Sequence, residues 1–388
     1  MKLALLAGNR FSAWHLRVFE RLQPAPEITA FRAESEIQRH FAERGANTLS
    51  FPTERIHFDT QAGPAWTRLK NILLERYGVR EARLLPFHDR LQGFDLIHSW
   101  ELFTEWTAEA LAAKEKWKIS LCLMVWDNLP FNMEQTAQRR EIKRRAIAQT
   151  DRFIVHTERS RHMLLTEGAN PEKIVCMAPG VDLDLFSPGK AQRDRFKLQA
   201  DEFVILFVGW FLPRKGIDFL LVALREALND PAFQKKRIRL LAIGSGPGKD
   251  RVDQLVKRLG IEQACVFPGA LPYDQMPEAF RAADVFVLPS IATPEWQEQF
   301  GMSLIEAMAC GVPVISTWTG AIPEIVGDAG ILCQPNDALS LHTALKDLMN
   351  MHEKRLELAQ QGRERAERHF SLAQYAENLS GVYQALAE

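Results

Sequence analysis

Two glutamates stand on either side of a glycine that precedes a helical pattern. Because Gly301 comes directly before that pattern, the backbone amides of Met302 and Ser303 should be free at a helix N-terminus, where amides and the helix dipole bind an anion. Glu306, inside the helix, could accept hydrogen bonds from paired hydroxyls such as a ribose diol, and Glu298 from hydroxyls on the other side of the anion. Two carboxylates around a phosphate site suit a nucleotide-sugar. The alternative is a capped surface helix with incidental glutamates.

A second group of candidate residues is cationic. Arg214 and Lys215 follow a predicted strand that ends at Gly209 and precede a helical pattern, so they could neutralise a diphosphate leaving group. A solvated basic turn is the alternative. Another buried strand is followed by a glycine turn that begins at Gly244. The spacing of this turn is not that of a P-loop, so by itself it is a weak indication of phosphate binding.

Short apolar runs alternate with helical patterns along the whole chain, which predicts the elements that hold these residues. Runs that are hydrophobic on both faces are typical of strands in a buried parallel sheet. We predict strands at 3–7, 28–31, 95–98, 119–126, 153–156, 174–177, 203–208, 238–243, 265–267, 285–288, 314–316 and 331–333. The helical patterns between them lie at 103–116, 134–149, 159–167, 218–228, 249–259, 302–309 and 339–351, and a last helical segment, 353–388, has a break near 370–371.

This alternation predicts an α/β protein with two doubly wound domains, because strands followed by long helices form βαβ units with right-handed crossovers. The polar stretch 181–200 marks the boundary. We expect the first domain to cover 1–186, joined by a C-terminal helix at 371–388, and the second to cover 187–370. Ligands of such sheets bind beyond the carboxyl ends of the strands. Two carboxyl edges that face each other across a cleft would suit a reaction that joins two substrates.

Composition excludes several classes of protein. The 388 residues include 48 Lys and Arg against 49 Asp and Glu, so the net charge of −1 argues against a partner nucleic acid bound by bulk basicity. A hydrophobic content of 46% excludes disorder for most of the chain. The five cysteines form no CxxC pair and lie mostly in apolar runs, so we expect buried reduced thiols and a cytoplasmic location. No apolar run approaches the length of a membrane span, and we expect the first residues to form a strand because their apolar run is too short for a signal peptide.

The order of the motifs resembles glycosyltransferase family 4, the glycosyl transferases group 1 family, which has the GT-B fold of two facing Rossmann-like domains. The resemblance is carried mainly by residues 151–316. In chain order, the matching pieces are Pro179-Gly180-Val181-Asp182 with Phe186, the run VGWFLPRKG, the run IGSGP, the run FPGALPYDQMPEAFRAADVFVLPS, the pair Glu298 and Glu306 with Phe300-Gly301 between them, and the run TGAIPEIVGDAGILCQP.

The resemblance implies transfer of a sugar from a nucleotide-diphosphate donor with retention of anomeric configuration, without a metal or another cofactor. Glu306 would hold the donor ribose, Glu298 the hydroxyls of the transferred sugar, and Lys215 the diphosphate. Lys215 and the backbone amides near Gly301 would stabilise the leaving group. The donor-binding residues expected are Arg214, Lys215, Gly244, Glu298, Phe300, Gly301, Met302, Ser303 and Glu306, and the catalytic residues are Glu298, Lys215 and His98.

The chain departs from the family pattern in the first domain and at one strand end. The family commonly has Arg directly after the strand-end glycine, where this chain has Trp210, and Arg214 could compensate for the missing cation. The family's first domain often has an H-x-H-like pair, of which this chain has His98 followed by Trp100 in the second place. His98 is therefore either functional or a strand-end histidine satisfied by the backbone. The first loop is reduced to Gly8-Asn9-Arg10.

Two further motifs have structural alternatives. The string Asp182-Leu183-Asp184 has the form of a metal-binding DxD motif, but it lies in the segment before the linker and we interpret it as structural. Helix 138–147 carries Arg139, Arg140, Lys143, Arg144 and Arg145, which form either a solvated surface or a patch for anionic lipid headgroups or an anionic acceptor. The second interpretation would place the protein at the inner face of the membrane.

The sequence therefore predicts a retaining, metal-independent glycosyltransferase whose second domain binds the nucleotide-sugar. The acceptor, a glycan, a lipid-linked sugar or a small molecule, is not identified. A non-catalytic sugar-nucleotide-binding or scaffold protein of the same fold is the alternative, suggested by Trp210 and Trp100. A GT-B phosphorylase would need a pyridoxal-phosphate lysine or an inorganic phosphate site, for which no motif is found. A nicotinamide dehydrogenase is disfavoured because no G-x-G-x-x-G follows the first strand.

Overall fold

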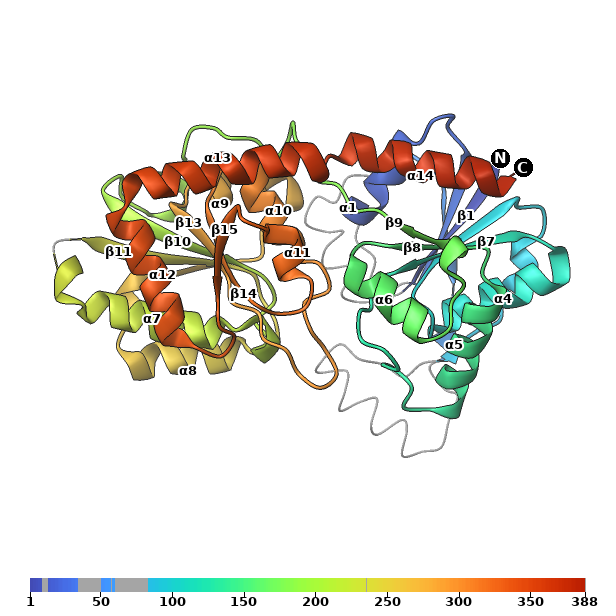
Figure 1. Ribbon diagram of the computed structural model, residues 1–388, viewed down its shortest axis with the longest axis horizontal. Helices are drawn as coiled ribbons and strands as arrows, with labels where there is room; N and C mark the ends of the chain where they lie inside the picture. Colours follow the sequence, from blue (N-terminus) through green and yellow to red (C-terminus); the bar gives the residue numbers. More distant parts are fainter. Residues whose placement is uncertain (9–12, 34–49, 57, 60–82, 235, 388) are drawn as a thin grey trace. The chain divides into compact units, whose positions relative to one another are not determined.

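The computed structural model describes residues 1–8, 13–33, 50–56, 58–59, 83–234 and 236–387 (Figure 1). The chain divides into two compact units. Unit 1 consists of Met1–Ala178 together with Ala373–Glu388, and unit 2 consists of Pro179–Leu372. The first boundary lies eight residues before the one that the sequence analysis placed at 186, and the second lies two residues after the one placed at 371.

Unit 1 is built on a parallel sheet with the strand order β3-β2-β1-β6-β7-β8-β9 in its described part. The strands are β1 (Lys2–Gly8), β2 (Glu27–Ala33), β3 (Thr53–Ile56), β6 (Leu96–Trp100), β7 (Ser120–Val125), β8 (Arg152–Val155) and β9 (Ile174–Cys176). The central strands β1 and β7 are buried on both faces, as their continuous apolar runs predict. A separate short antiparallel pair joins β4 (Phe58–Asp59) to β5 (Arg83–Leu84).

Three helices of unit 1 begin directly after threonine residues whose side chains cap them. Thr104, Thr136 and Thr157 each accept a hydrogen bond from the backbone amide three residues later, which satisfies one of the free amides of the first turn. The helices are α1 (Ala13–Leu16), α4 (Glu105–Trp117), α5 (Ala137–Gln149), α6 (Glu158–Thr166) and α14 (Leu372–Ala387), with 3-10 turns at Arg17–Arg21, His88–Leu91 and Pro171–Lys173.

The last helix belongs to unit 1 although its residues lie at the end of the chain. In Figure 1, α14 is the red helix that runs over the strands of this unit. The Tyr383 hydroxyl lies 2.6 Å from Nδ1 of His98 on β6, and the Ser380 hydroxyl accepts a hydrogen bond from the amide of Gln23 at 3.0 Å. These contacts join the C-terminus to the sheet of the first half of the chain.

Unit 2 is built on a second parallel sheet with the order β12-β11-β10-β13-β14-β15. Its strands are β10 (Glu202–Val208), β11 (Arg237–Ile243), β12 (Cys265–Gly269), β13 (Val285–Leu288), β14 (Val314–Thr317) and β15 (Gly330–Cys333). Its helices are α7 (Ile217–Asn229), α8 (Lys249–Leu259), α9 (Met276–Arg281), α10 (Met302–Ala309), α11 (Ile322–Val326), α12 (Ala338–Asn350) and α13 (His352–His369), with 3-10 turns at Arg193–Phe196, Pro213–Lys215, Pro231–Phe233, Glu262–Ala264 and Tyr273–Gln275.

The predicted strands and helices agree with the structure to within about two or three residues at their ends. The break in the last helical segment is confirmed, since α13 ends at His369 and α14 begins at Leu372. The sequence analysis missed β3, whose residues Thr53–Ile56 include two charged side chains and bury only Ile56. An edge strand that buries one side chain has too little apolar pattern to be found by periodicity.

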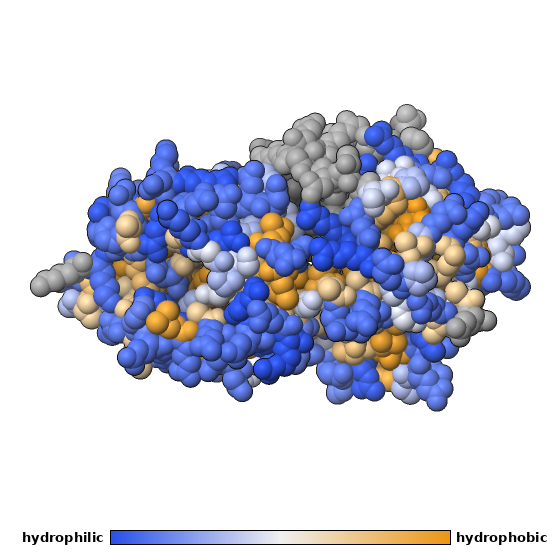
Figure 2. All heavy atoms as spheres, turned by 90° about the horizontal axis from the view of Figure 1, so that it is seen from above, coloured by the Kyte–Doolittle hydropathy of each residue, from blue (hydrophilic) through white to orange (hydrophobic). Residues whose placement is uncertain are grey.

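The described surface is mostly hydrophilic, and the thiols differ in burial. Figure 2 shows a face on which hydrophilic residues predominate and hydrophobic ones gather in small patches. Among the helices that the structure describes, none is both long and apolar enough to cross a membrane. None of the five cysteines, all of which are described, forms a disulfide. Cys122, Cys310 and Cys333 are buried as expected, whereas Cys265 is half-buried and Cys176 is exposed, so the expectation of buried thiols fails for these two.

Candidate functional site

The polar residues predicted in the second half meet at the carboxyl ends of β10, β13 and β14. In unit 2, β10 pairs with β11 on one side and with β13 on the other, so the chain leaves these two neighbouring strands in opposite directions. At such a switch point the two loops diverge and leave room for a ligand. The loops after β10 and β13 carry Lys215 and Glu298.

The loop after β10 fits against the loop after β13 because of one glycine. Gly216 has φ of 69°, and a Cβ at this position would lie 1.8 Å from the carbonyl oxygen of Pro289. No other residue type fits there without moving the backbone. The amide of Ile291 donates a hydrogen bond of 2.9 Å to the carbonyl of Arg214. The cationic turn Pro213–Lys215 is therefore fixed to the neighbouring loop by backbone contacts.

Lys215 and Glu298 form a partly buried ion pair. Lys215 Nζ lies 2.7 Å from Glu298 Oε2, and the two side chains are 18% and 6% exposed. Glu298 Oε2 also accepts a hydrogen bond of 2.6 Å from the Ser290 hydroxyl. The sequence assigned these two side chains separate roles, on phosphate and on sugar hydroxyls. The structure shows that they also orient each other.

The loop after β14 closes the other side of Glu298. The Glu298 carbonyl accepts a hydrogen bond of 2.9 Å from the amide of Ala321. Gly320 has φ of 54°, and a Cβ there would lie 2.1 Å from the same carbonyl oxygen. Three loops that are distant in sequence therefore meet at Glu298: Lys215 of the loop after β10 and Ser290 of the loop after β13 contact its carboxylate, and the loop after β14 contacts its backbone carbonyl.

Helix α10 begins in the manner predicted for an anion site. Gly301 is its N-cap residue with φ of 89°, and no side chain caps the helix. The amides of Met302 and Ser303 are in the first turn, which contains no acidic residue that would compete for them. The helix thus presents polar N–H groups at the carboxyl edge of the sheet.

Glu306 lies buried inside α10, where a surface glutamate would have been exposed. Glu306 is 5% exposed. Burial raises the pKa of its carboxyl group to about 7, although a hydrogen bond with Tyr273 opposes the shift. A buried carboxylate without a cation beside it is costly unless hydrogen-bond donors reach it. This burial disfavours the alternative of an incidental surface glutamate.

The other predicted donor residues have different surroundings. Gly244 has φ of 143°, and a Cβ there would lie 1.9 Å from the carbonyl of Gly209, so this glycine allows the loops after β10 and β11 to approach closely. The Phe300 side chain is buried and packs edge-on against Phe370, so its ring belongs to the core. Trp210, in the place where the family commonly has Arg, is 44% exposed.

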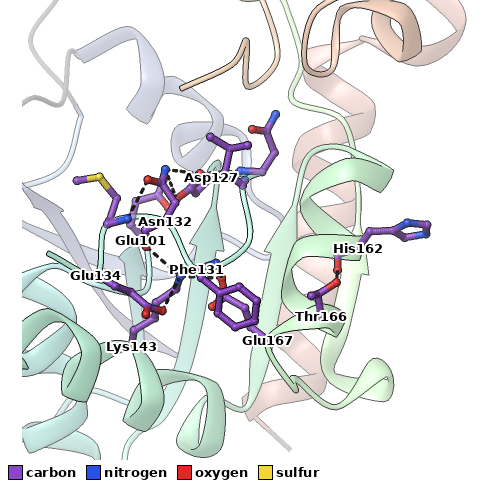
Figure 3. Close-up of polar contacts among 12 residues, drawn as sticks. Glu101, Asp127, Phe131, Asn132, Glu134, Lys143, His162, Thr166 and Glu167 are labelled. Atoms are coloured by element: carbon purple, nitrogen blue, oxygen red, sulfur yellow. Dashed lines mark hydrogen bonds and ion pairs between the residues drawn. The ribbon is translucent and has the colours of Figure 1, made fainter. Parts of the chain in front are cut away.

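The carboxyl edge of the sheet in unit 1 carries two carboxylates that the sequence analysis missed (Figure 3). Glu101 follows β6 with φ of 64°, a conformation that is uncommon outside glycine. Its carboxylate accepts hydrogen bonds from the amides of Trp126, at 3.1 Å, and Asp127, at 3.4 Å. Burial, followed by the charge of Asp127, raises the pKa of Glu101 to about 8. The signal that could have found them was their position near strand ends: Asp127 directly follows the predicted strand 119–126, and Glu101 lies three residues after the end of the predicted strand 95–98.

Asp127 organises the loop that follows β7. Its Oδ1 accepts hydrogen bonds from the amides of Asn128, at 2.8 Å, and Leu129, at 3.2 Å, and both carboxylate oxygens lie within 3.2 Å of Asn132 Nδ2. This loop then passes through two residues with positive φ, Phe131 and Met133. A carboxylate that satisfies so many donors of one loop fixes the shape of that loop.

Lys143 of the predicted basic helix is buried and does not belong to a surface patch. Its Nζ lies 2.6 Å from Glu167 Oε1, and the two side chains are 3% and 2% exposed. Lys143 also donates to the Asn132 carbonyl at 3.0 Å, while Glu167 accepts from the amide of Phe131 at 2.7 Å. This pair holds the β7–α5 loop, with the Phe131 side chain beside it in Figure 3.

The arginines of α5 have partners that reduce the charge of its face. Arg144 forms an ion pair with Glu141 at 2.7 Å, and Arg145 forms one with Glu115 at 2.9 Å. Arg140 donates to the carbonyl of Glu134 at 2.7 Å. These contacts favour a solvated surface over a strongly positive patch.

His98 lies in the core of unit 1 and not at an open edge. It is fully buried in β6, Nδ1 faces the Tyr383 hydroxyl, and its ring packs against Trp100 at 4.5 Å between ring centres. Burial lowers the pKa of His98 to about 3, so the imidazole is neutral at physiological pH. These surroundings favour a structural role, although the partner is a tyrosine hydroxyl and not the backbone.

The DxD string has the structural role expected from its position. Asp182 Oδ1 accepts hydrogen bonds from the amides of Asp184, at 3.2 Å, and Leu185, at 3.3 Å, which form a side-chain-stabilised turn. Within the described ranges, no group of three or more His, Cys, Asp or Glu side chains is arranged to hold a metal ion. The first-loop residues Asn9 and Arg10 lie outside the described residues.

Comparison with solved structures identifies the class of this fold. The Anabaena protein HepE, solved in complex with UDP, superposes with a TM-score of 0.76 at 18% identity over 99% of this chain and 100% of that chain. The sucrose-phosphate synthase of Thermosynechococcus elongatus superposes with a TM-score of 0.75 at 20% identity over 100% and 99%. The chain therefore has the GT-B glycosyltransferase fold, with two Rossmann-like units. Each unit is a parallel sheet flanked by helices, and each sheet has polar residues at its carboxyl edge.

Sequence comparison then gives the family. Residues 190–365 match the family Glycosyl transferases group 1, and residues 38–185 match Glycosyltransferase Family 4. The D-inositol 3-phosphate glycosyltransferase of Stackebrandtia nassauensis is 32% identical over 310 residues, which cover 75% of this chain and 68% of that relative. The chain therefore belongs to the glycosyl transferases group 1 family.

A further relative matches over a shorter region. The D-inositol 3-phosphate glycosyltransferase of Geodermatophilus obscurus is 33% identical over 252 residues, which cover 62% of this chain. The matched region spans about half, 54%, of that relative's length.

Proposed function

We propose that this protein transfers a sugar from a nucleoside-diphosphate sugar to an acceptor hydroxyl with retention of anomeric configuration. The observation that supports this most directly is the convergence of Lys215, Glu298 and the uncapped N-terminus of α10 at the switch point of unit 2. A cation and free amides suit a diphosphate, and buried carboxylates suit hydroxyls of a ribose and a hexose. Family membership and the UDP complex of the structurally similar HepE support the same donor class.

In the proposed reaction, the bond between the anomeric carbon and the diphosphate oxygen breaks while the acceptor oxygen bonds to that carbon on the same face. The acceptor proton passes to an oxygen of the departing diphosphate. Lys215 and the amides of Met302 and Ser303 stabilise the negative charge that develops on the leaving group. Glu298 orients the hydroxyls of the transferred sugar, and Glu306 accepts hydrogen bonds from the ribose.

Donor class is tested by thermal shift with UDP-, GDP-, ADP- and TDP-sugars. A ligand at 100 times its dissociation constant adds about 2.7 kcal/mol to the stability of the unit that binds it. We expect one nucleotide to stabilise the wild type and to lose most of this effect in Lys215→Ala and Glu306→Ala. Lack of stabilisation by every nucleotide-sugar would contradict the proposal.

Turnover, stereochemistry and metal independence need separate measurements. D-inositol 3-phosphate is the first acceptor to test, because the names of the relatives contain this compound, and inositol without the phosphate is measured beside it. Proton NMR of the product reports the anomeric configuration, and we expect it to equal that of the donor. We also expect the rate to be unchanged in a chelator, because Lys215 and the helix amides take the place of a metal at the diphosphate. A rate that requires added Mg²⁺ or Mn²⁺ would contradict this.

The second candidate is a sugar-nucleotide-binding protein without turnover, which the exposed Trp210 supports because it takes the place of a family cation. Tight binding of a donor with neither transfer nor hydrolysis would favour it. A cytoplasmic location and contact of α5 with a membrane surface stay predictions. Co-sedimentation with anionic vesicles tests the second of these.

A further inference from the structure

One phenylalanine of unit 1 is both exposed to water and held in a strained backbone conformation. Phe131 is 61% exposed, whereas every other phenylalanine whose burial the structure describes is buried or half-buried. Its φ of 58° lies in the left-handed region, which is costly for a residue with a side chain and is adopted freely by glycine. An aromatic ring at this position therefore adds strain and exposed apolar surface, neither of which stabilises the fold.

The surrounding polar side chains hold this strained loop in place. The amide of Phe131 donates to Glu167 at 2.7 Å, and Glu167 forms the buried ion pair with Lys143 (Figure 3). The side chain of Asn132, the next residue, donates to both carboxylate oxygens of Asp127, at 3.1 and 3.2 Å. Burying an ion pair is costly, and here the pair fixes the shape of an exposed loop. Strain that is held by many contacts is typical of a binding site formed in advance of its ligand.

The loop that carries Phe131 lies at the edge of the sheet where ligands of this kind of fold bind. In unit 1, β1 pairs with β2 on one side and with β6 on the other, so the switch point lies between β1 and β6. Glu101 directly follows β6, and its carboxylate accepts hydrogen bonds from the amides of Trp126 and Asp127. These two residues begin the loop that contains Phe131. The loop is therefore attached to the switch point of unit 1.

We propose that the Phe131 ring is the surface on which unit 1 binds the acceptor, and that the acceptor is a sugar or a cyclitol. The ring of such a compound has C–H bonds on its faces and hydroxyls around its rim. An aromatic side chain can cover one face while the hydroxyls keep their hydrogen bonds. Because the loop is already ordered, little conformational entropy is lost on binding. The proposal rests on the proposed transferase function, whose donor residues lie in unit 2.

A lipid surface is the other kind of partner for an exposed aromatic residue. Helix α5, which follows the loop, would then supply cations for anionic headgroups. Arg144 and Arg145 of this helix are each paired with a glutamate, at 2.7 and 2.9 Å. This pairing of charges favours the acceptor over a membrane as the partner of Phe131.

Ligand-observed NMR titrations of the full chain measure the affinity for three probes, inositol, D-inositol 3-phosphate and methyl glucoside, without and with UDP, GDP or ADP. We expect at least one probe to bind the wild type, and Phe131→Ala to weaken this binding about tenfold. Phe131→Tyr keeps the ring and should stay within about twofold of the wild type. Leu356→Ala is the matched control, because Leu356 is 56% exposed but lies on α13 of unit 2, and it should bind the probes as the wild type does.

Thermal unfolding separates a binding role from a packing role without any measurement of activity. An exposed ring that serves a ligand contributes little to folding, so the melting temperature of unit 1 in Phe131→Ala should stay within about 2 °C of the wild type. Phe131→Gly, which also lacks the ring but relieves the left-handed strain, should melt above Phe131→Ala. A fall of more than about 5 °C in Phe131→Ala would overturn the proposal, because it would indicate that the ring packs in the fold.

The remaining outcomes distinguish the role of Phe131 from the proposed function. Failure of every probe to bind the wild type, or equal binding by Phe131→Ala, would overturn the role of Phe131. Loss of binding to phosphatidylglycerol vesicles in Phe131→Ala, with unchanged probe affinity, would assign the ring to a membrane and overturn it as well. The proposed function fails by a different result, the lack of stabilisation of the wild type by every nucleotide-sugar.

Discussion

Replacing Glu306 by glutamine should stabilise unit 2 at neutral and alkaline pH while it weakens donor binding. Glutamine has nearly the same shape, retains an oxygen that can accept from Tyr273, and is neutral at every pH. The wild-type carboxyl is buried in α10, and desolvation of its charged form raises its pKa to about 7 from 4.5. The Glu306 carboxylate, which is proposed to bind the donor, thus destabilises the protein when no ligand is bound, as functional residues often do.

The sign and size of the effect follow from proton linkage. Below pH 4.5 the carboxyl is neutral in the folded and unfolded chain, so its burial is tolerated. Between pH 4.5 and about 7 the unfolded chain releases this proton while the folded chain keeps it, and stability falls as pH rises. Above the folded pKa the loss is complete and is on the order of 3 kcal/mol, at about 1.36 kcal/mol for each unit of pKa difference.

Calorimetry over pH 5 to 8.5, which resolves the unfolding of the two units, measures this effect. For a domain of about 150–250 residues, ~3 kcal/mol corresponds to an increase in melting temperature of roughly 6–12 °C. We expect this increase for Glu306→Gln at pH 8.5 and little change at pH 5. Glu226→Gln, at an exposed position of α7, is the control and should show no pH-dependent difference. A difference between Glu306→Gln and wild type that stays constant across the pH range would refute the reasoning.

Three further predictions concern backbone fit and burial. In denaturant titrations, Gly216→Ala should lower the stability of unit 2 by more than about 2 kcal/mol, because a positive φ and a clash with a carbonyl oxygen combine. Gly260→Ala is the control: Gly260 has φ of 65° but nothing within 4 Å of its Cβ position, so this variant should lose only the conformational penalty of about 1–2 kcal/mol. Lys143→Met should destabilise unit 1 by about 3 kcal/mol in the same assay, because it leaves a buried glutamate unpaired; a change below about 1 kcal/mol would contradict the burial argument. Tyr383→Phe should lower stability by about 1 kcal/mol and leave the transfer rate within about twofold, and a large loss of rate in the still-folded variant would restore a catalytic role for His98.

The local elements and the donor-side candidates were accessible from the sequence. Apolar runs on both faces and helical periodicity depend on neighbouring residues, so they predict strands such as β13 and helices such as α10 at their observed limits. Glu306 and Gly301 lie in one such helix and its cap, so their relation is also local. The motif order added the family, which the comparisons confirm.

Interactions between distant parts of the chain were not accessible in this way. The sequence could place Lys215 and Glu298 at strand ends, but they are 83 positions apart, and only the order of β10 and β13 in the sheet brings them to 2.7 Å. It could not show that the Trp296 ring would lie against Arg214 and Lys215, since that contact depends on the shape of two loops. Loop shape is set by backbone contacts and by glycine conformations, which periodicity does not encode.

Burial changed the interpretation of two residues for the same reason. His98 has the position of a strand-end histidine in the sequence, yet a helix 285 positions away covers it and provides its hydrogen-bond partner. Lys143 has the spacing of an exposed basic face, yet a glutamate 24 positions away makes it an internal ion pair. The sequence by itself determined which segments fold and which residue types reach the strand ends. Only the tertiary structure decided which of them meet and which are removed from water, because both depend on the packing of segments that are far apart in the chain.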